Sequence, residues 1–335
     1  MTDTTYNVYG AGYIPGVPGT FSNASVTVNG PQVVAETTLG QASTLLTMQS
    51  LIFSVKDYGA VGDGTTDDTT AIATAINTAV TAGGGVVFFP PGVYLSGPQT
   101  LHAKLHFVGA GIEASILKLK NATNADLLSA QVSSINLAAS FGTGPAGTLY
   151  NFSVQNLTLD GNKAGQSSGT SYPLRFYGYG YIVHNVRIRN GYSGGVLSDW
   201  NGGASSPGVD SMESQWSNVK VHDCNGINIQ FGGPHDSQFS NVISYSSGLH
   251  CFHIAPNAGG HCLVNCHGWG PAPSVGAVVY LIEAGLCLFS NCVAEGSDTV
   301  NVVWLGVQCS WSGGVIFGTT ANETASGNLA TYAAV

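Results

Sequence analysis

Six short segments of this 335-residue chain resemble one another. Each sets an asparagine beside an alternation of apolar and polar residues. These asparagines are Asn156, Asn185, Asn218, Asn241, Asn265 and Asn291, at steps of 29, 33, 23, 24 and 26 residues. A repeat of this size cannot bury its apolar side alone and must stack on its neighbours. The pattern therefore predicts an all-β solenoid, a single-stranded parallel β-helix of about ten coils.

The composition fits closely stacked strands and argues against disorder. Hydrophobic residues make up 44% of the chain and charged residues only 8%, with 46 glycines. Disordered chains have the opposite balance. Nine basic and 18 acidic residues give a net charge of -9, which disfavours nucleic acid and anionic membrane surfaces as partners. Neutral glycans suit this charge, and acidic glycans require a local basic patch.

No targeting or membrane-spanning segment is evident in the sequence. The first residues, MTDTTYNVYGAGYIPGVPG, contain neither a basic n-region nor an apolar h-region. No stretch reaches the roughly 20 apolar residues that span a membrane. We therefore expect synthesis in a cytoplasm without a signal peptide, no membrane insertion, and an extracellular role that depends on another exit, such as cell lysis.

Seven cysteines lie in the C-terminal half of the chain. Their odd number and their spacing argue against a disulfide framework or a zinc site, and no cluster of aspartates has calcium-binding spacing. Cys266 and Cys292 each follow a repeat asparagine, at the position that Val219 and Val242 occupy in neighbouring coils. We interpret these cysteines as small core residues stacked from coil to coil, and we expect no metal and no cofactor.

A single amphipathic helix is predicted just before the repeats. Thr66, Asp67 and Asp68 offer an N-cap and first-turn carboxylates. The apolar stripe that follows at helical spacing consists of Ala71, Ile72, Ala75, Ile76, Ala79 and Val80. Glycines from Gly83 end the helix, and a buried strand follows. A helix in this place would cover the open end of the first coil.

The segment from Val55 to Gly97 carries a family resemblance. Its sequence, VKDYGAVGDGTTDDTTAIATAIN followed by GGGVVFFPPGVYLSG, resembles the opening of pectate lyase superfamily modules of the rhamnogalacturonase and polygalacturonase type, which many phage tailspikes contain. The resemblance implies a right-handed parallel β-helix and a polysaccharide partner. The opening motif belongs to the cap and first coil, so the resemblance transfers no catalytic residue.

The chain is expected to fall into four parts. Residues 1–50 are nearly uncharged and have too little core to fold alone, so we interpret them as an attachment or oligomerisation segment. Residues 51–100 would form the cap helix and first coil, residues 101–317 the β-helix, and residues 318–335 a C-terminal tail. Residues 1–50 look like the attachment region of a phage tail protein, which implies a place in the virion, contacts with other tail proteins, and a homotrimer.

The leading hypothesis is a phage-type tailspike or minor tail protein that binds host-surface polysaccharide, with cleavage of that glycan left open. One alternative is a free-standing polysaccharide hydrolase or lyase. The other is a structural virion protein without catalytic activity. The absent signal peptide and the unusual first 50 residues favour the virion interpretations.

One candidate site comes from aligning the coils on their asparagines and on Gly232, Gly285 and Gly306. This alignment places four residues in register, namely Gln230, His253, Glu283 and Trp304. Their apolar neighbours should point inward and the four residues outward. A histidine beside a carboxylate is a plausible proton-transfer pair, and Trp304 could carry a sugar ring. An ordinary polar ladder on a solvent-exposed face is the alternative.

A second candidate is the excursion from Gly191 to Asn218 that widens one coil. It carries Asp199, Trp200, Asp210, Glu213 and Trp216. Glycoside hydrolysis needs two carboxylates beside the scissile bond, one protonated and one ionised, and loops on solenoids often carry binding groups. The alternative is a loop of solvated carboxylates.

Two further groups complete the candidates. His235-Asp236 lies at a turn near the same edge, so Asp236 is a possible catalytic residue. The central coils lack the paired aspartates that the resemblance to polygalacturonases would require, which puts hydrolysis in doubt.

The other group surrounds the only three arginines, Arg175, Arg187 and Arg189, with tyrosines such as Tyr177 nearby. A lyase needs a base and a cation that stabilises the enolate, and an arginine could neutralise a uronate while rings stack on sugars. The alternative for Arg187 and Arg189 is that they simply alternate outward as solubilising charges.

Overall fold

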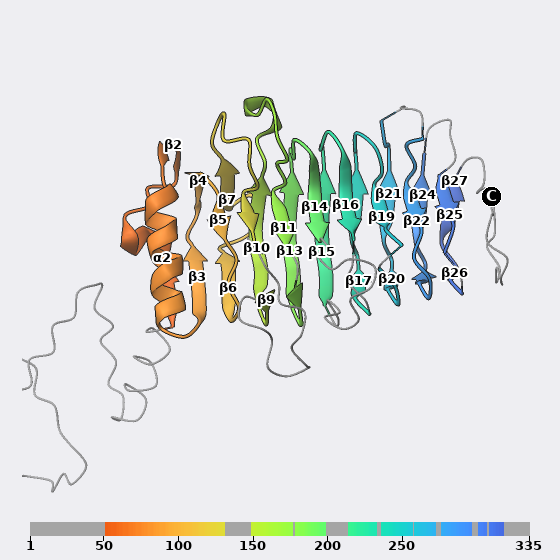
Figure 1. Cartoon of the computed structure of the whole chain (residues 1–335), viewed down its shortest axis with the longest axis horizontal. Helices are drawn as coiled ribbons and strands as arrows, with labels where there is room; N and C mark the ends of the chain where they lie inside the picture. Colours follow the sequence, from red (N-terminus) through yellow and green to blue (C-terminus); the bar gives the residue numbers. More distant parts are fainter. Residues whose placement is uncertain are drawn as a thin grey trace, which may run out of the picture. The chain divides into compact units, whose positions relative to one another are not determined.

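The computed structural model describes residues 51–130, 149–176, 178–198, 214–232, 236–256, 258–272, 276–296, 301–306 and 308–317. The chain divides into two units between Leu51 and Ile52. The predicted attachment segment, residues 1–50, and the predicted tail, residues 318–335, lie outside the described residues. The unit that begins at Ile52 is a row of stacked coils, which Figure 1 shows side by side.

The coils are built from parallel strands in three ladders. The first ladder runs through β1 (Ile52–Ser54), β3 (Gly85–Phe89), β6 (Leu105–Gly109), β10 (Ser153–Asp160), β13 (Ile182–Arg189), β15 (Gln215–His222), β17 (Gln238–Ser240), β20 (Cys262–Val264), β23 (Leu288–Ser290) and β26 (Ser310–Ser312). These ten strands agree with the predicted number of coils.

The second ladder shares the long strands β10, β13 and β15 with the first. Its other strands are β2 (Asp63–Asp67), β4 (Gly92–Ser96), β7 (Ser115–Leu119), β18 (Ile243–Tyr245), β21 (His267–Trp269), β24 (Val293–Glu295) and β27 (Val315–Phe317).

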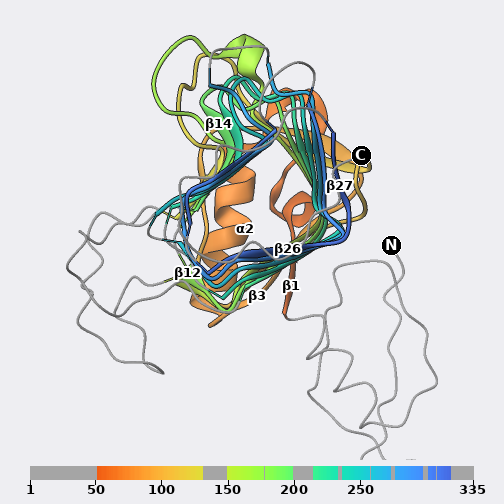
Figure 2. The ribbon, with the colours of Figure 1, turned by 90° about the vertical axis from the view of Figure 1, so that its right-hand side faces the viewer.

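The third ladder is a separate sheet of β5 (Gln99–Thr100), β8 (Leu128–Ser129), β11 (Leu174–Phe176), β14 (Gly194–Ser198), β16 (Ile227–Phe231), β19 (Phe252–Ile254), β22 (Tyr280–Ile282) and β25 (Val302–Trp304). A short pair, β9 (Leu149–Tyr150) and β12 (Gly178–Tyr179), completes the strands. Seen along the row of coils, the ladders surround one interior (Figure 2). The predicted all-β parallel β-helix is confirmed.

The repeat asparagines mark the bend between the first and second ladders. All six adopt a left-handed backbone, with φ between 52° and 55°. Asparagine tolerates this conformation better than other residues with a side chain, apart from aspartate. The Asn185 amide donates to Asn156 Oδ1 at 2.7 Å, and the Asn241 amide donates to Asn218 Oδ1 at 3.4 Å. The repeat therefore reflects a backbone requirement together with hydrogen bonds between coils.

The interior is a stack of apolar side chains from every coil. The inward column of the first ladder is buried throughout and consists of Phe53, Val87, Phe107, Val154, Val183, Trp216, Phe239, Leu263, Phe289 and Trp311. Behind the asparagines lies a second buried column of Leu157, Val186, Val219, Val242, Cys266 and Cys292. The predicted core position of Cys266 and Cys292 is confirmed. Trp216, which the sequence suggested as a loop residue for binding, is 1% exposed and belongs to this core.

The cap consists of a short 3-10 helix, η1 (Val55–Tyr58), and the helix α2 (Thr69–Thr81). Helix α2 lies at the N-terminal end of the row of coils (Figures 1 and 2) and buries Ile72, Ala75, Ile76 and Ala79. Val80, predicted in this stripe, is 41% exposed because it lies at the edge of the buried face. A second 3-10 helix, η2, spans Lys163–Gly165.

Asp68 has a different role from the predicted cap. Its carboxylate accepts hydrogen bonds from the backbone N–H groups of Val61, at 2.7 Å, and Gly62, at 3.1 Å. It therefore holds the loop before the helix, and Asp67 accepts from the N–H of Thr69 at the helix start. No helix among the described residues is long and apolar enough to cross a membrane.

Candidate functional site

The outer face of the third ladder carries several of the predicted site residues in one column. Strand pairing aligns Arg175 with Leu197, Leu197 with Gln230, and Gln230 with His253. The predicted register of Gln230 and His253 is therefore confirmed, and Arg175 joins them. The predicted inward residues Ile229, Phe231, Ile254 and Ile282 are all at most 3% exposed. The column that includes Gln230 and His253 consequently faces outward.

The predicted register of Glu283 and Trp304 is wrong. His253 pairs with Leu281, so Glu283 lies two positions further along, and Trp304 pairs with Ile282. The coil from His253 to Leu281 is 28 residues long, against 23 from Gln230 to His253. Gly285 therefore does not occupy the position of Gly232 in its coil. The alignment on these glycines did not account for the extra residues of the longer coil, and this is why it misplaced Glu283.

The His253 and Glu283 side chains nevertheless meet. Glu283 follows the last residue of β22, and its backbone N–H donates to Ile254 O at 2.8 Å. This bond holds the carboxylate over the neighbouring coil, where Oε2 lies 2.7 Å from His253 Nε2. Glu283 keeps 29% of its side chain exposed and His253 only 13%. Solvent or a ligand can reach the carboxylate, and the imidazole lies mainly beneath it.

The second ring nitrogen of His253 points into the protein. His253 Nδ1 is buried and has no hydrogen-bond partner among the described residues. An N–H at Nδ1 would lose its hydrogen bond to water without replacement, which is costly. The geometry therefore fits an imidazole that carries its hydrogen on Nε2 and donates it to Glu283. In this arrangement His253 orients the carboxylate, and Glu283 is the group that can exchange a proton with a ligand.

A second histidine, His250, lies beside this pair and was missed in the sequence. Its ring centroid lies 5.9 Å from that of His253, and its Nδ1 accepts the N–H of Val278 at 3.2 Å. Burial lowers the pKa of His250 to about 4. The sequence offered one signal for His250, its position three residues before His253. Alternation along a strand, however, would place two residues with this separation on opposite sides.

His250 should make the fold sensitive to acid. An unfolded chain protonates histidine near pH 6.5, whereas folded His250 stays neutral down to about pH 4. Between these values the unfolded state binds a proton that the folded state does not, so the free energy of unfolding falls as the pH is lowered. In denaturant unfolding across this pH range, the free energy of unfolding should fall less steeply for His250→Asn than for the wild-type protein. The asparagine has no titrating ring but can still accept the Val278 N–H. An unchanged slope would contradict this assignment.

The remaining predicted site residues are separate from this pair. Asp236 is exposed at the turn before β17 and has no hydrogen bond or ion pair with His253 or Glu283 among the described residues. Arg175 Nη1 lies 3.6 Å from Asp126 Oδ2. Asp199, Trp200, Asp210, Glu213, Tyr177, His235 and the side chain of Trp304 lie outside the described residues.

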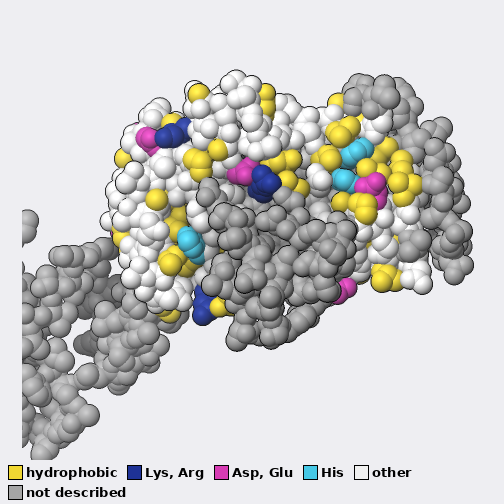
Figure 3. Space-filling view, in the orientation of Figure 1, with side chains coloured by type: hydrophobic (Ala, Val, Ile, Leu, Met, Phe, Trp, Pro, Cys, Tyr) yellow, Lys and Arg dark blue, Asp and Glu magenta, His cyan; other side chains and the backbone are white. Residues whose placement is uncertain are grey.

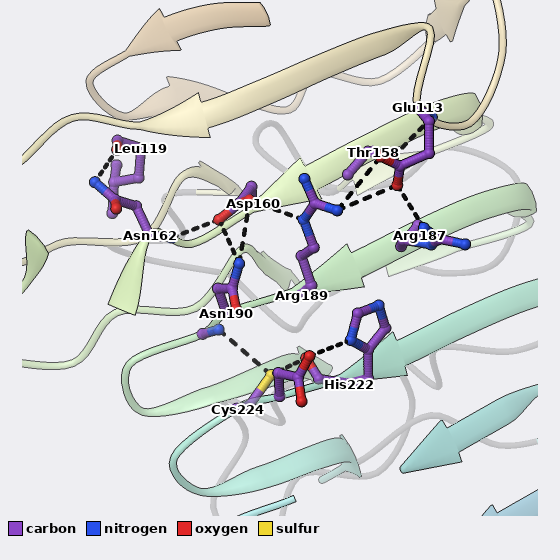
Figure 4. Close-up of polar contacts among 12 residues, drawn as sticks. Glu113, Leu119, Thr158, Asp160, Asn162, Arg187, Arg189, Asn190, His222 and Cys224 are labelled. Carbon is purple, nitrogen blue, oxygen red and sulfur yellow. Dashed lines mark hydrogen bonds and ion pairs between the residues drawn. The ribbon is translucent and has the colours of Figure 1, made fainter. Parts of the chain in front are cut away.

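Arg187 and Arg189 lie on another face, the outer side of the second ladder. Their neighbours Val186 and Ile188 are fully buried, so the predicted alternation is confirmed. They are not isolated surface charges, because both contact the carboxylate of Glu113 and Arg189 also contacts Asp160 (Figure 4).

Charged side chains are sparse on the face that Figure 3 shows. In the view of Figure 3, histidine and acidic side chains lie together among hydrophobic ones over the C-terminal coils. Within the described part of the chain, no group of three or more His, Cys, Asp and Glu residues could hold a metal ion.

A family model described as "Rhamnogalacturonase A/epimerase, pectate lyase-like" matches residues 52–260, which is more than half of the chain. The chain belongs to this family. The match begins at the first strand, includes the cap, and extends through β19, so this pectate lyase-like module contains His250 and His253 within the matched region, while Glu283 lies beyond it.

Two curated relatives from Azotobacter vinelandii share sequence with this pectate lyase-like module. Mannuronan C5-epimerase AlgE2 is 30% identical over 242 residues, which cover 65% of this chain and 22% of the epimerase. Alginate lyase 7 is 30% identical over 226 residues, which cover 62% of this chain and 24% of the lyase. The module thus spans about a quarter of the length of these relatives.

The fold also resembles that of a solved phage protein. Tailspike protein 2 from Escherichia coli O157:H7 bacteriophage CAB120 superposes with a TM-score of 0.57 at 11% sequence identity, covering 78% of this chain and 34% of the tailspike. At this identity the likeness concerns the fold of the pectate lyase-like module alone.

Proposed function

We propose that this chain is the glycan-recognising part of a phage-type tail protein, and that it binds and cleaves a uronic-acid polysaccharide on the outer face of the third ladder. The observation that carries the proposal is the 2.7 Å contact between His253 and the partly exposed Glu283 carboxylate. The names of the two relatives, a mannuronan epimerase and an alginate lyase, support an acidic glycan. The likeness to a tailspike supports the virion setting.

The proposed reaction is an elimination at a uronate residue. Glu283 takes the proton from the carbon next to the sugar carboxylate, and the electrons of that C–H bond form a new C=C bond. The adjacent C–O bond to the next sugar breaks, and its oxygen leaves with the bonding electrons and gains a proton from water. The Nε2–H of His253 holds the carboxylate in place. General acid–base groups of this kind contribute about 10²- to 10⁴-fold to a rate.

The polysaccharide would cross several coils. Arg175 lies three coils from His253 in the same outer column, which at about 4.8 Å per coil is roughly 14 Å. Gln230 lies between them and offers an amide for sugar hydroxyl groups. Arg175 contacts a carboxylate, Asp126, at 3.6 Å, and its guanidinium suits a second carboxylate from a uronate. The outer column of the third ladder therefore has Arg175 at one end, where a uronate carboxylate would bind, and His253 with Glu283 at the other, where the elimination would occur.

Binding can be tested apart from cleavage. Calorimetric titration should detect binding of oligomannuronate and none of a neutral mannose oligosaccharide of equal length. Arg175→Gln should weaken oligomannuronate binding about tenfold, because a charge-assisted hydrogen bond is lost. Lys163→Gln, which removes a positive charge elsewhere, is the matched control. Equal affinity for the neutral and acidic oligosaccharides would contradict the proposed ligand class.

The first ladder supports the proposed homotrimer. Its outward positions carry no lysine, arginine, aspartate or glutamate, and comprise Ile52, Ser54, Val86, Phe88, His106, Val108, Ser153, Gln155, Ile182, His184, Gln215, Ser217, Gln238, Ser240, Cys262, Val264, Leu288, Ser290, Ser310 and Ser312. Ile52, Ile182 and Leu288 are 42% to 51% exposed. A chain with a net charge of -9 can bring copies of such a face together without placing like charges in contact.

A further inference from the structure

Two arginines on the second ladder hold one carboxylate between them (Figure 4). Oε1 of Glu113 lies 2.5 Å from Arg187 Nη1 and 3.2 Å from Arg189 Nη1. Arg189 Nη1 also lies 3.4 Å from Glu113 Oε2. Arginine presents its donors in a rigid plane that suits carboxylates, so this arrangement is a binding geometry for one carboxylate. We call Arg187 and Arg189 the two-arginine site.

Within the two-arginine site, the side chain of Arg189 is fixed by a contact that does not involve Glu113. Both arginines lie on β13, which pairs along its length with β10 and β15. Arg189 Nε donates to Asp160 Oδ2 at 2.8 Å, and Asp160 is 5% exposed and also accepts the Asn190 amide at 3.1 Å. Arg187 Nε is buried and has no partner among the described residues. The Arg189 guanidinium would therefore keep its place if Glu113 left.

Glu113 itself is held weakly. It lies in the turn between β6 and β7 with a left-handed φ of 64°. Its side chain is 45% exposed, and its backbone N–H makes one long bond, 3.3 Å, to Thr158 Oγ1. Ion pairs with this exposure are screened by solvent and stabilise a fold little. An external carboxylate can therefore compete with Glu113 at little cost.

The surroundings fit a sugar chain with further acidic groups. Lys118 and Lys220 point outward from neighbouring coils of the same ladder. Further along, Tyr245 and Trp269 stack with ring centroids 4.5 Å apart, and both are partly exposed. The Tyr245 hydroxyl and the Trp269 indole N–H are hydrogen-bond donors of the kind that suits sugar hydroxyl groups.

We propose that the two-arginine site binds the carboxylate of a uronate residue, and that Glu113 occupies the site until such a ligand displaces it. The proposal rests on the acidic-glycan class of the proposed function, but it concerns a different face from His253 and Glu283. It gives the protein a second contact with the polysaccharide, through which a long chain could stay bound between cleavage events.

The chain offers a direct test because it contains only three arginines. A spectrum of arginine Nε–Hε groups should show one signal each for Arg175, Arg187 and Arg189, assigned with Arg187→Lys and Arg189→Lys. Glucuronate is the probe, and its uncharged methyl ester is the control ligand. Glucuronate should shift the signals of Arg187 and Arg189, whereas the ester should not. In Glu113→Gln the dissociation constant should fall about fivefold, since the internal competitor is gone.

Asp57→Asn is the matched control variant, because it removes an equal charge at an exposed site and should leave the affinity unchanged. The proposal is overturned if glucuronate leaves the Arg187 and Arg189 signals in place in Glu113→Gln, or if Asp57→Asn tightens binding equally. The outcomes also separate the two proposals. Shifts of the Arg187 and Arg189 signals without any cleavage of polysaccharide would contradict the proposed reaction alone, and cleavage without shifts of these two signals would contradict the two-arginine site alone.

Discussion

Replacing Glu283 with glutamine should reduce cleavage of a uronic-acid polysaccharide at least about 100-fold, because the variant loses the group that takes the proton. Glutamine is of nearly equal size and can still accept the Nε2–H of His253. The fold and the binding of oligomannuronate should therefore change little. Initial rates of product formation, together with calorimetric titration of the oligosaccharide, separate loss of chemistry from loss of binding.

The second ladder provides a matched control for this variant. His267 and Glu295 form another histidine–glutamate pair, with Nε2 and Oε1 3.4 Å apart. Glu295→Gln makes the same chemical change in a similar pair on a different face and should leave the cleavage rate within about twofold of wild type. Equal losses in the two variants would mean that net charge or stability, and not the third-ladder pair, determines the rate.

Adding positive charge to the first ladder should convert the proposed trimer into a monomer. Gln215 and Gln238 pair on neighbouring coils and are both exposed. Lysine at both positions would place like charges together at an interface where the wild-type face has none, and buried like charges without partners are strongly unfavourable. Light scattering coupled to size-exclusion chromatography should then report the mass of one chain instead of three.

The control for assembly adds the same two charges to the cap. Thr74→Lys with Asn77→Lys lies on the exposed side of α2 and should leave the mass at three chains. A wild-type protein that is already a monomer, or a Gln215→Lys, Gln238→Lys variant that keeps its assembly, would contradict the role proposed for the first ladder.

The fold was predictable because one local requirement recurs in every coil. Each repeat asparagine satisfies a left-handed bend, and the residue after it enters the core. The spacing of the asparagines therefore indicates both where the backbone bends and which residues pack in the core. For this reason Cys266 and Cys292 could be assigned to the interior, because they occupy the position of Val219 and Val242 in neighbouring coils. Alternation within short strands then gave the direction of Gln230 and His253 correctly.

The candidate site was only partly predictable, since coil lengths vary outside the asparagine bends. The longer coil before β22 moved Glu283 two positions from its predicted register, yet a backbone bond to Ile254 returned its side chain to His253. No spacing rule anticipates such a contact. Glu113 is a similar case, because it is 74 residues from Arg187 in sequence and reaches it through a turn that the repeat does not contain.

The measurement that tests the central proposal most directly is an incubation of the full chain with polymannuronate, following both new reducing ends and the ultraviolet absorbance of a new C=C bond. Elimination at Glu283 predicts that both signals rise together in the wild-type protein and that neither rises in Glu283→Gln. Reducing ends without absorbance would mean hydrolysis. Neither signal, with the polysaccharide still bound, would mean that the protein binds glycan without cleaving it, and either result would contradict the proposed reaction.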